Sequence, residues 1–259
     1  MSAPWDYIAK LVCIGDSGCG KSSLTIRLCE GRFSPHHDVT IGVEFGSRIV
    51  PVGPPHSKTS SSIPSVSSLS DAKSNGEPTN EDRELQDSAQ KYMKLSLWDT
   101  AGQETYKSVT RSYFRGASGA LLVFDLSRRD TFTHATDWLA DLRQIAEPDI
   151  VVILVGNKAD LTSDDDGDDK DKRAVTRVEA EDWARKNGVL EYVETSAKSG
   201  INVEMAFMRV AERIFQNIEA GKYDLDDRRS GVKRQTQSAG GTGGRVRLNE
   251  SRSKGGMCC

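Results

Sequence analysis

The chain has 259 residues, of which 36% are apolar and 28% are charged, and its formal net charge at pH 7 is −3. This length suits one large domain or one domain with tails, and the low apolar fraction indicates a packed domain diluted by less apolar segments. The slightly acidic balance argues against a dedicated nucleic-acid binder, which is usually basic. No run of about eighteen apolar residues occurs, so no segment is predicted to span a bilayer.

The first residues of the chain and its cysteines indicate the cellular compartment in which the protein is expected. Residues 1–6 have neither the basic region nor the apolar core of a secretory signal, and position 2 is not the glycine that N-myristoylation requires. The cysteines match neither a disulfide framework nor a zinc site; they are Cys13, Cys19, Cys29, Cys258 and Cys259. A reducing cytosol fits this pattern.

The first part of the chain is predicted to form a strand, a glycine loop, a helix and a second strand. Residues 7–14 form a short apolar run that stops at Gly15. A helical pattern starts after Gly20 and ends near Gly31, a residue type common just past helix ends. Residues 43–52 alternate in polarity and contain β-branched side chains, which predicts a strand.

Residues 51–91 differ sharply in composition from what precedes them. They hold five of the eight prolines and ten serines, and they show no apolar periodicity. We predict a mostly disordered insertion between two strands. Its serines are candidate phosphorylation sites. The simpler interpretation is a solvated loop that the domain tolerates, because a long surface loop costs little closure entropy.

Regular structure resumes after the insertion. Residues 92–98 alternate as a strand does, and residues 119–126 and 150–156 are continuous apolar runs, typical of strands buried on both faces of a parallel sheet. The remaining predicted elements are helices over 130–146, 178–187 and 201–220 and a short strand over 190–193. Strands that alternate with helices predict a doubly wound α/β domain.

Two charged segments interrupt or follow this pattern. Residues 162–173 carry six aspartates, but Thr162 and Arg173 occupy the first and twelfth positions of an EF-hand loop, where Asp and Glu are needed. A solvated acidic loop is therefore favoured over a calcium site. Residues 228–259 contain eight Lys or Arg, one Glu and many glycines, which predicts a flexible basic tail.

The glycine loop between the first strand and the first helix fits the pattern G-x-x-x-x-G-K-[ST]. Glycines let backbone amides curl around a phosphate, and the positive N-terminal end of the helix adds attraction. We predict that Lys21 reaches the β- and γ-phosphates and that the Ser22 hydroxyl ligates Mg²⁺. A glycine turn without a ligand is the alternative. The candidate phosphate-binding residues are Gly15, Asp16, Ser17, Gly18, Cys19, Gly20, Lys21, Ser22 and Ser23.

A second motif directly follows the predicted strand at 150–156, at the edge where open α/β sheets bind ligands. It contains Asn157, Lys158 and Asp160. We expect the Asp160 carboxylate to accept hydrogen bonds from guanine N1–H and the 2-amino group, two donors that adenine lacks. The Lys158 stem is expected to cover the base plane. A backbone contact to guanine O6 is expected from Ser196, Ala197 and Lys198.

A third motif, residues 98–104 (WDTAGQE), follows the strand after the insertion. We expect Asp99 to hold Mg²⁺ through water, the Gly102 amide to sense a γ-phosphate, and Gln103 to orient the attacking water. Thr40, in the loop after the first helix, is expected to complete the Mg²⁺ shell only when the γ-phosphate is present. Phosphoryl transfer depends on such positioning and charge neutralisation more than on covalent catalysis.

Together these motifs resemble the Ras superfamily and, within it, the Rab family. The Rab-like stretches are residues 40–45 (TIGVEF), 98–104 (WDTAGQE) and 112–116 (SYFRG). With the Cys258–Cys259 ending, the sequence looks most similar to the Rab-two and Rab-four subgroup. By this resemblance Phe33 stacks on the guanine base, and Thr40 and Gln103 belong to the first and second switches.

The resemblance also implies a domain plan. A short extension at residues 1–6 precedes a P-loop GTPase domain over 7–220, interrupted at 51–91, and a flexible tail follows over 221–259. The implied sheet is six-stranded and mostly parallel, with helices on both faces and one antiparallel edge strand.

Two surface features follow from the same resemblance. The aromatic triad that Rab effectors read corresponds to Phe45, Trp98 and Tyr113, and the alternative is that these rings belong to the core. Cys258 and Cys259 match the ending that carries two geranylgeranyl groups, and the alternative is an accidental pair in a disordered tail. Two lipid chains anchor a protein stably, and basic residues add attraction to anionic headgroups.

The implied function is a GTP/GDP switch with slow, GAP-stimulated hydrolysis that controls vesicle traffic. It would act on the cytoplasmic face of early or recycling endosomes or the Golgi, with a cytosolic pool. The implied partners of this monomer are an exchange factor, a GTPase-activating protein, a GDP-dissociation inhibitor, the Rab escort protein with geranylgeranyl transferase, and effectors, with no nucleic acid.

Three alternatives remain open at this point, one of which is a soluble member of the same family that never reaches membranes and would leave Cys258 and Cys259 without lipid. A pseudo-GTPase scaffold would use the two insertions as docking segments, and a P-loop ATPase or nucleoside kinase would not need the motif at 157–160. The sequence departs from the Rab pattern in the insertion, in the long loop after Asp160, and at Thr105 and Tyr106, where many Rabs have Arg-Phe.

Overall fold

The computed structural model describes residues 4–35, 39–54, 90–103, 107–162, 172–227 and 230–235. Three predictions fall largely outside these ranges: the disordered insertion, the acidic loop, and the tail that ends in Cys258 and Cys259. Within the described ranges, no helix combines the length and apolar character that crossing a membrane requires.

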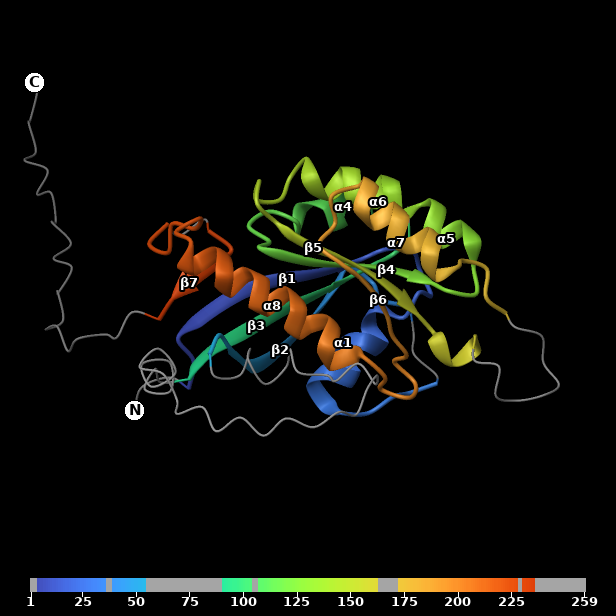
Figure 1. Ribbon diagram of the computed structural model, residues 1–259, viewed down its shortest axis with the longest axis horizontal. Helices are drawn as coiled ribbons and strands as arrows, with labels where there is room; N and C mark the ends of the chain where they lie inside the picture. Colours follow the sequence, from blue (N-terminus) through green and yellow to red (C-terminus); the bar gives the residue numbers. More distant parts are fainter. Residues whose placement is uncertain are drawn as a thin grey trace, which may run out of the picture.

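A mixed β-sheet forms the centre of the molecule, and its main path has the strand order β2-β3-β1-β4-β5-β6 (Figure 1). The strands of this path are β1 (Tyr7–Ile14), β2 (Val43–Val52), β3 (Lys91–Thr100), β4 (Gly119–Asp125), β5 (Val151–Asn157) and β6 (Tyr192–Glu194). The β2–β3 pair is antiparallel, and the other neighbouring pairs of the path are parallel. This path confirms the predicted mostly parallel sheet with one antiparallel edge strand, but the described sheet has a seventh strand, which the prediction of six did not include.

Helices cover both faces of the sheet (Figure 1). The described helices are α1 (Lys21–Glu30), α4 (Lys107–Ser112), α5 (Arg129–Thr133), α6 (Ala135–Arg143), α7 (Arg177–Lys186) and α8 (Val203–Glu219), with a 3₁₀ turn η2 (Ala159–Leu161). Helices α1 and α8 pack on one face, and α4, α5, α6 and α7 lie on the other. The fold is therefore the doubly wound α/β arrangement that the alternating pattern predicted.

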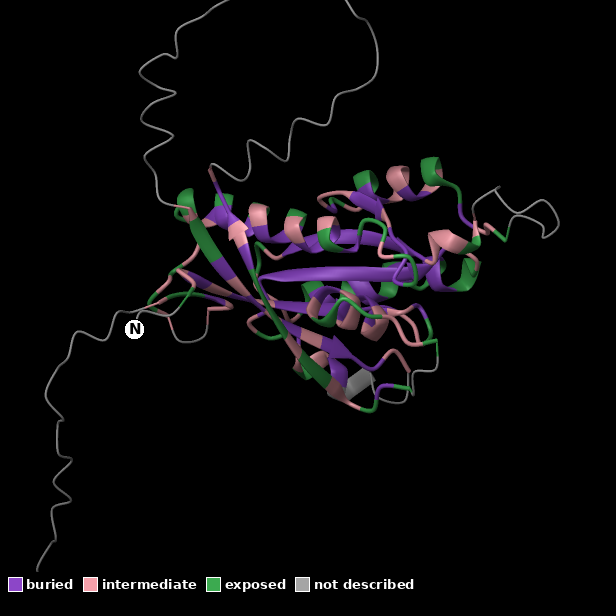
Figure 2. Cartoon of the chain, turned by 90° about the horizontal axis from the view of Figure 1, so that it is seen from below, coloured by how far each residue is buried: buried purple, intermediate pink, exposed green. Residues whose placement is uncertain are grey.

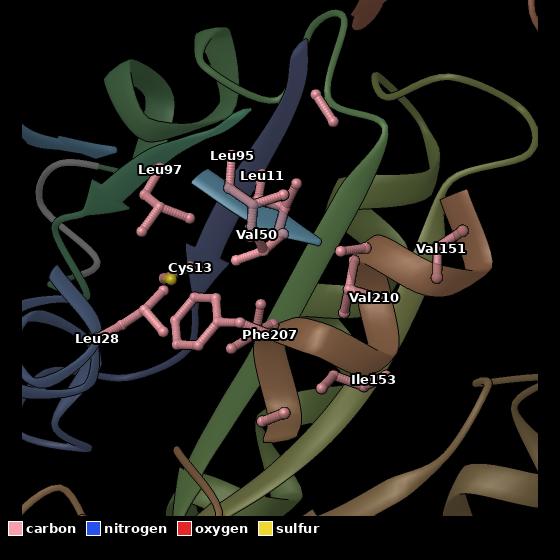
Figure 3. Packing of buried hydrophobic residues seen from close by; sticks show 14 of the residues in the cluster. Leu11, Cys13, Leu28, Val50, Leu95, Leu97, Val151, Ile153, Phe207 and Val210 are labelled. Atoms are coloured by element: carbon pink, nitrogen blue, oxygen red, sulfur yellow. The ribbon is translucent and has the colours of Figure 1, made fainter. Parts of the chain in front are cut away.

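The core consists of two apolar clusters separated by the sheet. Alternate residues of β4 enter opposite clusters: Leu121 packs on the α8 side, and Leu122 packs on the α6 side. All seven residues of β4 are buried, which explains why its sequence is a continuous apolar run. Figure 2 shows the central strands as buried along their length, and Figure 3 shows Phe207 of α8 against the sheet beside Leu28.

The predicted helix over 130–146 is divided into α5 and α6. His134 is the C-cap of α5 and also the N-cap of α6, with φ −69° and ψ −14°. Its carbonyl accepts from both the Asp137 and the Trp138 amides, so the chain passes through one tighter turn at this point. The α-helix and the tighter turn at His134 are both right-handed, so the spacing of apolar residues does not distinguish one continuous helix from two.

A short strand that the sequence analysis did not anticipate lies in the region described there as a flexible tail. Strand β7 (Val232–Arg234) pairs antiparallel with residues 7–9 of β1. Strand β7 pairs with the first residues of β1, which β4 leaves free because its own pairing with β1 begins only at Leu11. The Lys10 amide donates to Gly231 at 2.9 Å, and Val232 is fully buried. These contacts fix residues 230–235 against the domain.

Candidate nucleotide-binding site

The phosphate-loop motif connects β1 to α1, and two of its glycines are required by steric contact. Gly15 has φ +133°, and a Cβ placed there would lie 2.0 Å from the Val123 carbonyl oxygen. Gly20 has φ +91°, and its Cβ would lie 2.3 Å from the Asn157 amide nitrogen. Gly20 also caps α1 without a side-chain hydrogen bond, so the first amides of this helix are left for a ligand.

Lys21 is buried at the floor of this loop. Its Nζ donates to the carbonyl oxygens of Gly15 at 2.9 Å and Asp16 at 2.8 Å. Burial lowers the pKa of this amine. The Ser17 amide donates to Gly102 at 3.0 Å, and a Cβ on Gly102 would lie 2.4 Å from the Lys21 Nζ. The structure thus brings the first and third sequence motifs together around one ammonium group.

Three oxygen side chains from separate elements converge beside Lys21. The Ser22 hydroxyl lies 2.8 Å from the Thr40 hydroxyl, and the Thr40 hydroxyl donates to Asp99 Oδ2 at 3.4 Å. Asp99 is the last residue but one of β3 and has 1% of its surface exposed, and its Oδ1 has no hydrogen-bond partner among the described residues. Burial raises the pKa of Asp99 to about 6, against the opposing effects of Ser22 and Lys21.

The second motif follows β5, and Asn157 ties three loops together. Its Nδ2 donates to the Cys19 carbonyl at 2.8 Å. Its Oδ1 accepts from the Thr195 hydroxyl and from the Ala197 amide, both at 3.2 Å. Asn157 was predicted as a nucleotide contact, and its amide is used to hold the phosphate loop against the loops after β5 and β6.

Asp160 is oriented by the loop after β6. The Ser196 hydroxyl donates to Asp160 Oδ1 at 2.6 Å, and the Lys198 Nζ lies 4.0 Å from Asp160 Oδ2. Ser196 is fully buried, so it positions the carboxylate and does not face solvent. Lys158, just before η2, has φ +70°, a left-handed conformation that is uncommon outside glycine.

A cavity of about 490 Å³ connects these motifs, a size suited to a small-molecule ligand. It is lined by most of the predicted nucleotide-binding residues: Ser17, Gly18, Gly20, Lys21, Ser22, Ser23, Phe33, Thr40, Gly102, Asn157, Lys158, Asp160, Ala197 and Lys198. Four others do not line it; they are Gly15, Asp16, Cys19 and Ser196. The lining residues that the sequence analysis missed are Ser34, Pro35, Val39, Thr100 and Leu161, and each adjoins a predicted site residue or another member of this group.

The family model for Ras proteins matches residues 10–60 and 73–216, well over half of the chain. The chain belongs to the Ras family. Domains of this family are GTP-binding switches that bind GTP and GDP, typically with Mg²⁺, and have GTPase activity. They interact in general with exchange factors, GTPase-activating proteins and effectors. The unmatched residues 61–72 lie within the predicted insertion.

The residues near Lys21 fit the Mg²⁺ ion that Ras-family domains typically use. Ser22, Thr40 and Asp99 offer hard oxygen atoms, and the buried Asp99 Oδ1 lacks a partner among the described residues. Mg²⁺ is usually held by one or two protein ligands together with phosphates and water, so a small donor set is sufficient. Across the described ranges, no cluster of three or more His, Cys, Asp or Glu offers another metal site.

The aromatic side chains predicted to contact effectors form one continuous group on this Ras-family domain. Phe45 and Trp98 pack edge to face at 4.6 Å between ring centroids, and Trp98 and Tyr113 lie 5.7 Å apart. Phe45 is 65% exposed, so the triad is not simply part of the core. The Lys10 Nζ lies 3.8 Å from the Trp98 ring centroid, and partial burial lowers the pKa of Lys10 to about 8.

Proposed function

We propose that the chain is a Rab-type GTP/GDP switch, anchored to membranes by prenyl groups and acting in vesicle trafficking. The observation that carries the nucleotide part of this proposal is the convergence of Lys21, Ser22 and Thr40 at the cavity, with the Asp99 carboxylate accepting from Thr40. The Rab part is supported by the exposed aromatic triad and by the sequence stretches around it.

The switch operates through the loops that contain Thr40 and Gly102. In our proposal the Thr40 hydroxyl, now 2.8 Å from Ser22, joins the Mg²⁺ shell when a γ-phosphate is present. The Gly102 amide senses the same phosphate, and loss of GTP releases both loops. Mg²⁺ neutralises charge on the phosphates, and effectors bind the ordered state at Phe45, Trp98 and Tyr113.

Base selection and hydrolysis are assigned to separate groups. Asp160 is the proposed reader of guanine, supported by the Ser196 hydrogen bond that holds its carboxylate beside the cavity. Phe33 and the Lys158 stem are the proposed contacts to the base planes. Gln103 is the proposed catalytic residue that orients the attacking water.

Membrane attachment is assigned to the C-terminal residues. Cys258 and Cys259 are the proposed acceptors of two geranylgeranyl groups, and the basic tail adds attraction to anionic lipids. The proposed partners are an exchange factor, a GTPase-activating protein, a GDP-dissociation inhibitor, the Rab escort protein with its transferase, and effectors. The proposed location is the cytoplasmic face of early or recycling endosomes or the Golgi.

Two experiments test this proposal. In single-turnover hydrolysis with a GTPase-activating protein, Gln103→Leu should hydrolyse GTP far more slowly than wild type while binding it normally. Equal rates would remove Gln103 from catalysis, and no hydrolysis by the wild type would favour the pseudo-GTPase scaffold.

The second experiment measures prenylation. The purified chain should accept labelled geranylgeranyl groups from escort protein and transferase and then float with anionic vesicles. The variant Cys258→Ser/Cys259→Ser should do neither. Labelling of that variant, or no labelling of the wild type, would contradict the membrane assignment.

A further inference from the structure

Asp125 is a buried carboxylate at the carboxyl end of β4, between the phosphate loop and the base-reading motif. Its side chain is 1% exposed, and it does not line the cavity. Its Oδ2 lies 2.7 Å from the Lys158 Nζ and 3.0 Å from the Arg128 Nε. One oxygen atom therefore contacts two cations that come from different loops.

The first of these cations belongs to the base-reading motif. Lys158 lines the cavity and has φ +70°, a conformation that costs free energy for a residue with a side chain. Its ammonium group contacts Asp125, which faces Asn157 in the β4–β5 pairing. The ion pair therefore stabilises the local backbone conformation that sets the start of η2 and, with it, Asp160.

The second cation reaches the phosphate loop. Arg128 Nη2 donates to the Ser17 carbonyl at 2.9 Å, while Arg128 Nε bonds Asp125. The guanidinium also lies 3.4 Å from the position that a Cβ on Gly18 would take. Arg128 thus covers the outer side of the loop whose inner side faces the cavity. Its side chain is 47% exposed, and the contacts with Asp125 and Ser17 fix its direction.

Asp125 carries a negative charge that its two cationic neighbours stabilise. Burial on its own would raise the pKa of Asp125, but the hydrogen bonds from Lys158 and Ser127 outweigh it, and the pKa lies below its ordinary value. The carboxylate is therefore ionised at neutral pH. Removing a buried charge that serves two cations leaves both of them without their counter-ion.

We propose that Asp125 is a positioning residue that couples guanine recognition to phosphate binding, by holding Lys158 on one loop and Arg128 on the other. This role rests on the proposed nucleotide site and adds to it, because Asp125 does not line the cavity and acts only through residues that contact it. The Lys158 and Arg128 side chains both contact Asp125 Oδ2, so movement of either loop changes the contact that holds the other.

A purely local role for Asp125 is the rival explanation. Its Oδ1 accepts from the Ser127 amide at 2.9 Å and from the Ser127 hydroxyl at 2.7 Å, which is a turn-stabilising arrangement. Asp125→Asn separates the two explanations. Asparagine has the same shape and keeps an oxygen that accepts from Ser127, but it removes the charge from Lys158 and Arg128.

The test uses the full purified chain with Mg²⁺ and measures dissociation constants for GDP, GMP and IDP together with thermal unfolding. With affinity taken as the reciprocal of the dissociation constant, the GDP/GMP affinity ratio reports phosphate binding, and the GDP/IDP affinity ratio reports recognition of the 2-amino group. Asp125→Asn should weaken GDP binding at least about tenfold and reduce both ratios, because it releases both cations. Arg128→Gln, at a half-exposed position, should reduce the GDP/GMP affinity ratio more than the GDP/IDP affinity ratio.

Coupling is measured by combining the two changes. Arg128→Gln should have a smaller effect on GDP binding in the Asp125→Asn background than in wild type, since the two residues act as one unit. The matched control is Arg129→Gln, which removes the neighbouring arginine and its surface ion pair with Glu179. It should leave all three dissociation constants unchanged.

The outcomes that overturn the inference are distinct from failure of the nucleotide site. If wild type binds no guanine nucleotide, the proposed function is wrong and the inference falls with it. If wild type binds GDP but Asp125→Asn only lowers the unfolding temperature, with both ratios unchanged, Asp125 has only the local role. Additive effects of the two substitutions would likewise exclude the coupling.

Discussion

The two ends of β1 are held in place by different forces. At its carboxyl end, the chain turns through Gly15 into a loop whose carbonyl oxygens hold the buried Lys21 ammonium. At its amino end, residues 7–9 pair with β7, and Val232 is fully buried. The carboxyl end arranges charge for a ligand, whereas the amino end adds apolar burial and strand pairing. Substitutions at the first should therefore change affinity, and those at the second should change stability.

The largest expected effect is at the carboxyl end. Lys21→Ala should weaken GDP binding about 100-fold or more, because charge-assisted hydrogen bonds contribute ~1.5–3 kcal/mol each and this amine is positioned to make more than one. Titration with a fluorescent GDP measures the change. The control is Lys91→Ala, which removes an exposed ion pair with Asp6. GDP binding by Lys21→Ala within a few-fold of wild type would place the phosphates elsewhere.

The next effect belongs to the amino end of β1. A Cβ on Gly231 would lie 1.9 Å from the Gly116 carbonyl oxygen, so Gly231→Val should prevent β7 from docking. Exposure of Val232 should then lower the free energy of unfolding by about 1.5–3 kcal/mol, with GDP affinity unchanged. Denaturant unfolding and amide exchange at Lys10 measure these effects.

The control for this substitution is Lys233→Ala, on an exposed side chain of the same strand. It should leave unfolding and exchange as they are in wild type. Normal protection of the Lys10 amide in Gly231→Val would show that β7 does not depend on this close approach.

A smaller effect at the carboxyl end of β1 distinguishes the GTP-bound state from the GDP-bound state. Thr40→Ala removes the hydroxyl that contacts Ser22 and Asp99. It should speed release of a non-hydrolysable GTP analogue about five- to tenfold with Mg²⁺ present, since a hydrogen bond contributes ~1 kcal/mol, and leave GDP release unchanged. Thr40→Ser should restore the wild-type rate. Equal acceleration of GDP release would contradict a switch role for Thr40.

The smallest effect is a pH dependence at the outer side of the phosphate loop. The hydrogen bond to Asp16 raises the pKa of His134 above its ordinary 6.5. The stabilisation is therefore fully present below the unfolded pKa and is lost as pH rises through the folded pKa. The melting temperatures of wild type and His134→Ala should differ most near pH 5.5 and converge by about pH 8.5. The effect is small because the ring is half exposed; a constant difference would exclude this titration.

Strands β1 and β2 and the loops that follow strands show what the sequence alone can predict. The bounds of β1 and β2 match the prediction because short-range signals, a glycine stop and alternating polarity, mark them. The phosphate loop and the motif after β5 were found for the same reason. Their roles as ligand contacts stay predictions.

Two features could not be found in this way because they depend on tertiary contact. Strand β7 has only three residues, and its place beside β1 exists only because β4 starts later. The contact of Asp125 with Lys158 joins residues that follow two different strands, and no spacing in the chain marks it, although Asp125 and Arg128 are only three residues apart. A third feature, the division of α5 from α6 at His134, was missed for a different reason, because it is a local turn that the spacing of apolar residues does not reveal.

The central claim is a guanine-specific, Mg²⁺-dependent nucleotide site, and nucleotide exchange tests it most directly. Purified protein is loaded with fluorescent GDP and challenged with GTP or ATP, with Mg²⁺ present or chelated. We predict displacement by GTP and not by ATP, with faster exchange once Mg²⁺ is removed. Displacement by ATP, or failure to bind fluorescent GDP at all, would contradict the roles given to Asp160, Ser22 and Asp99.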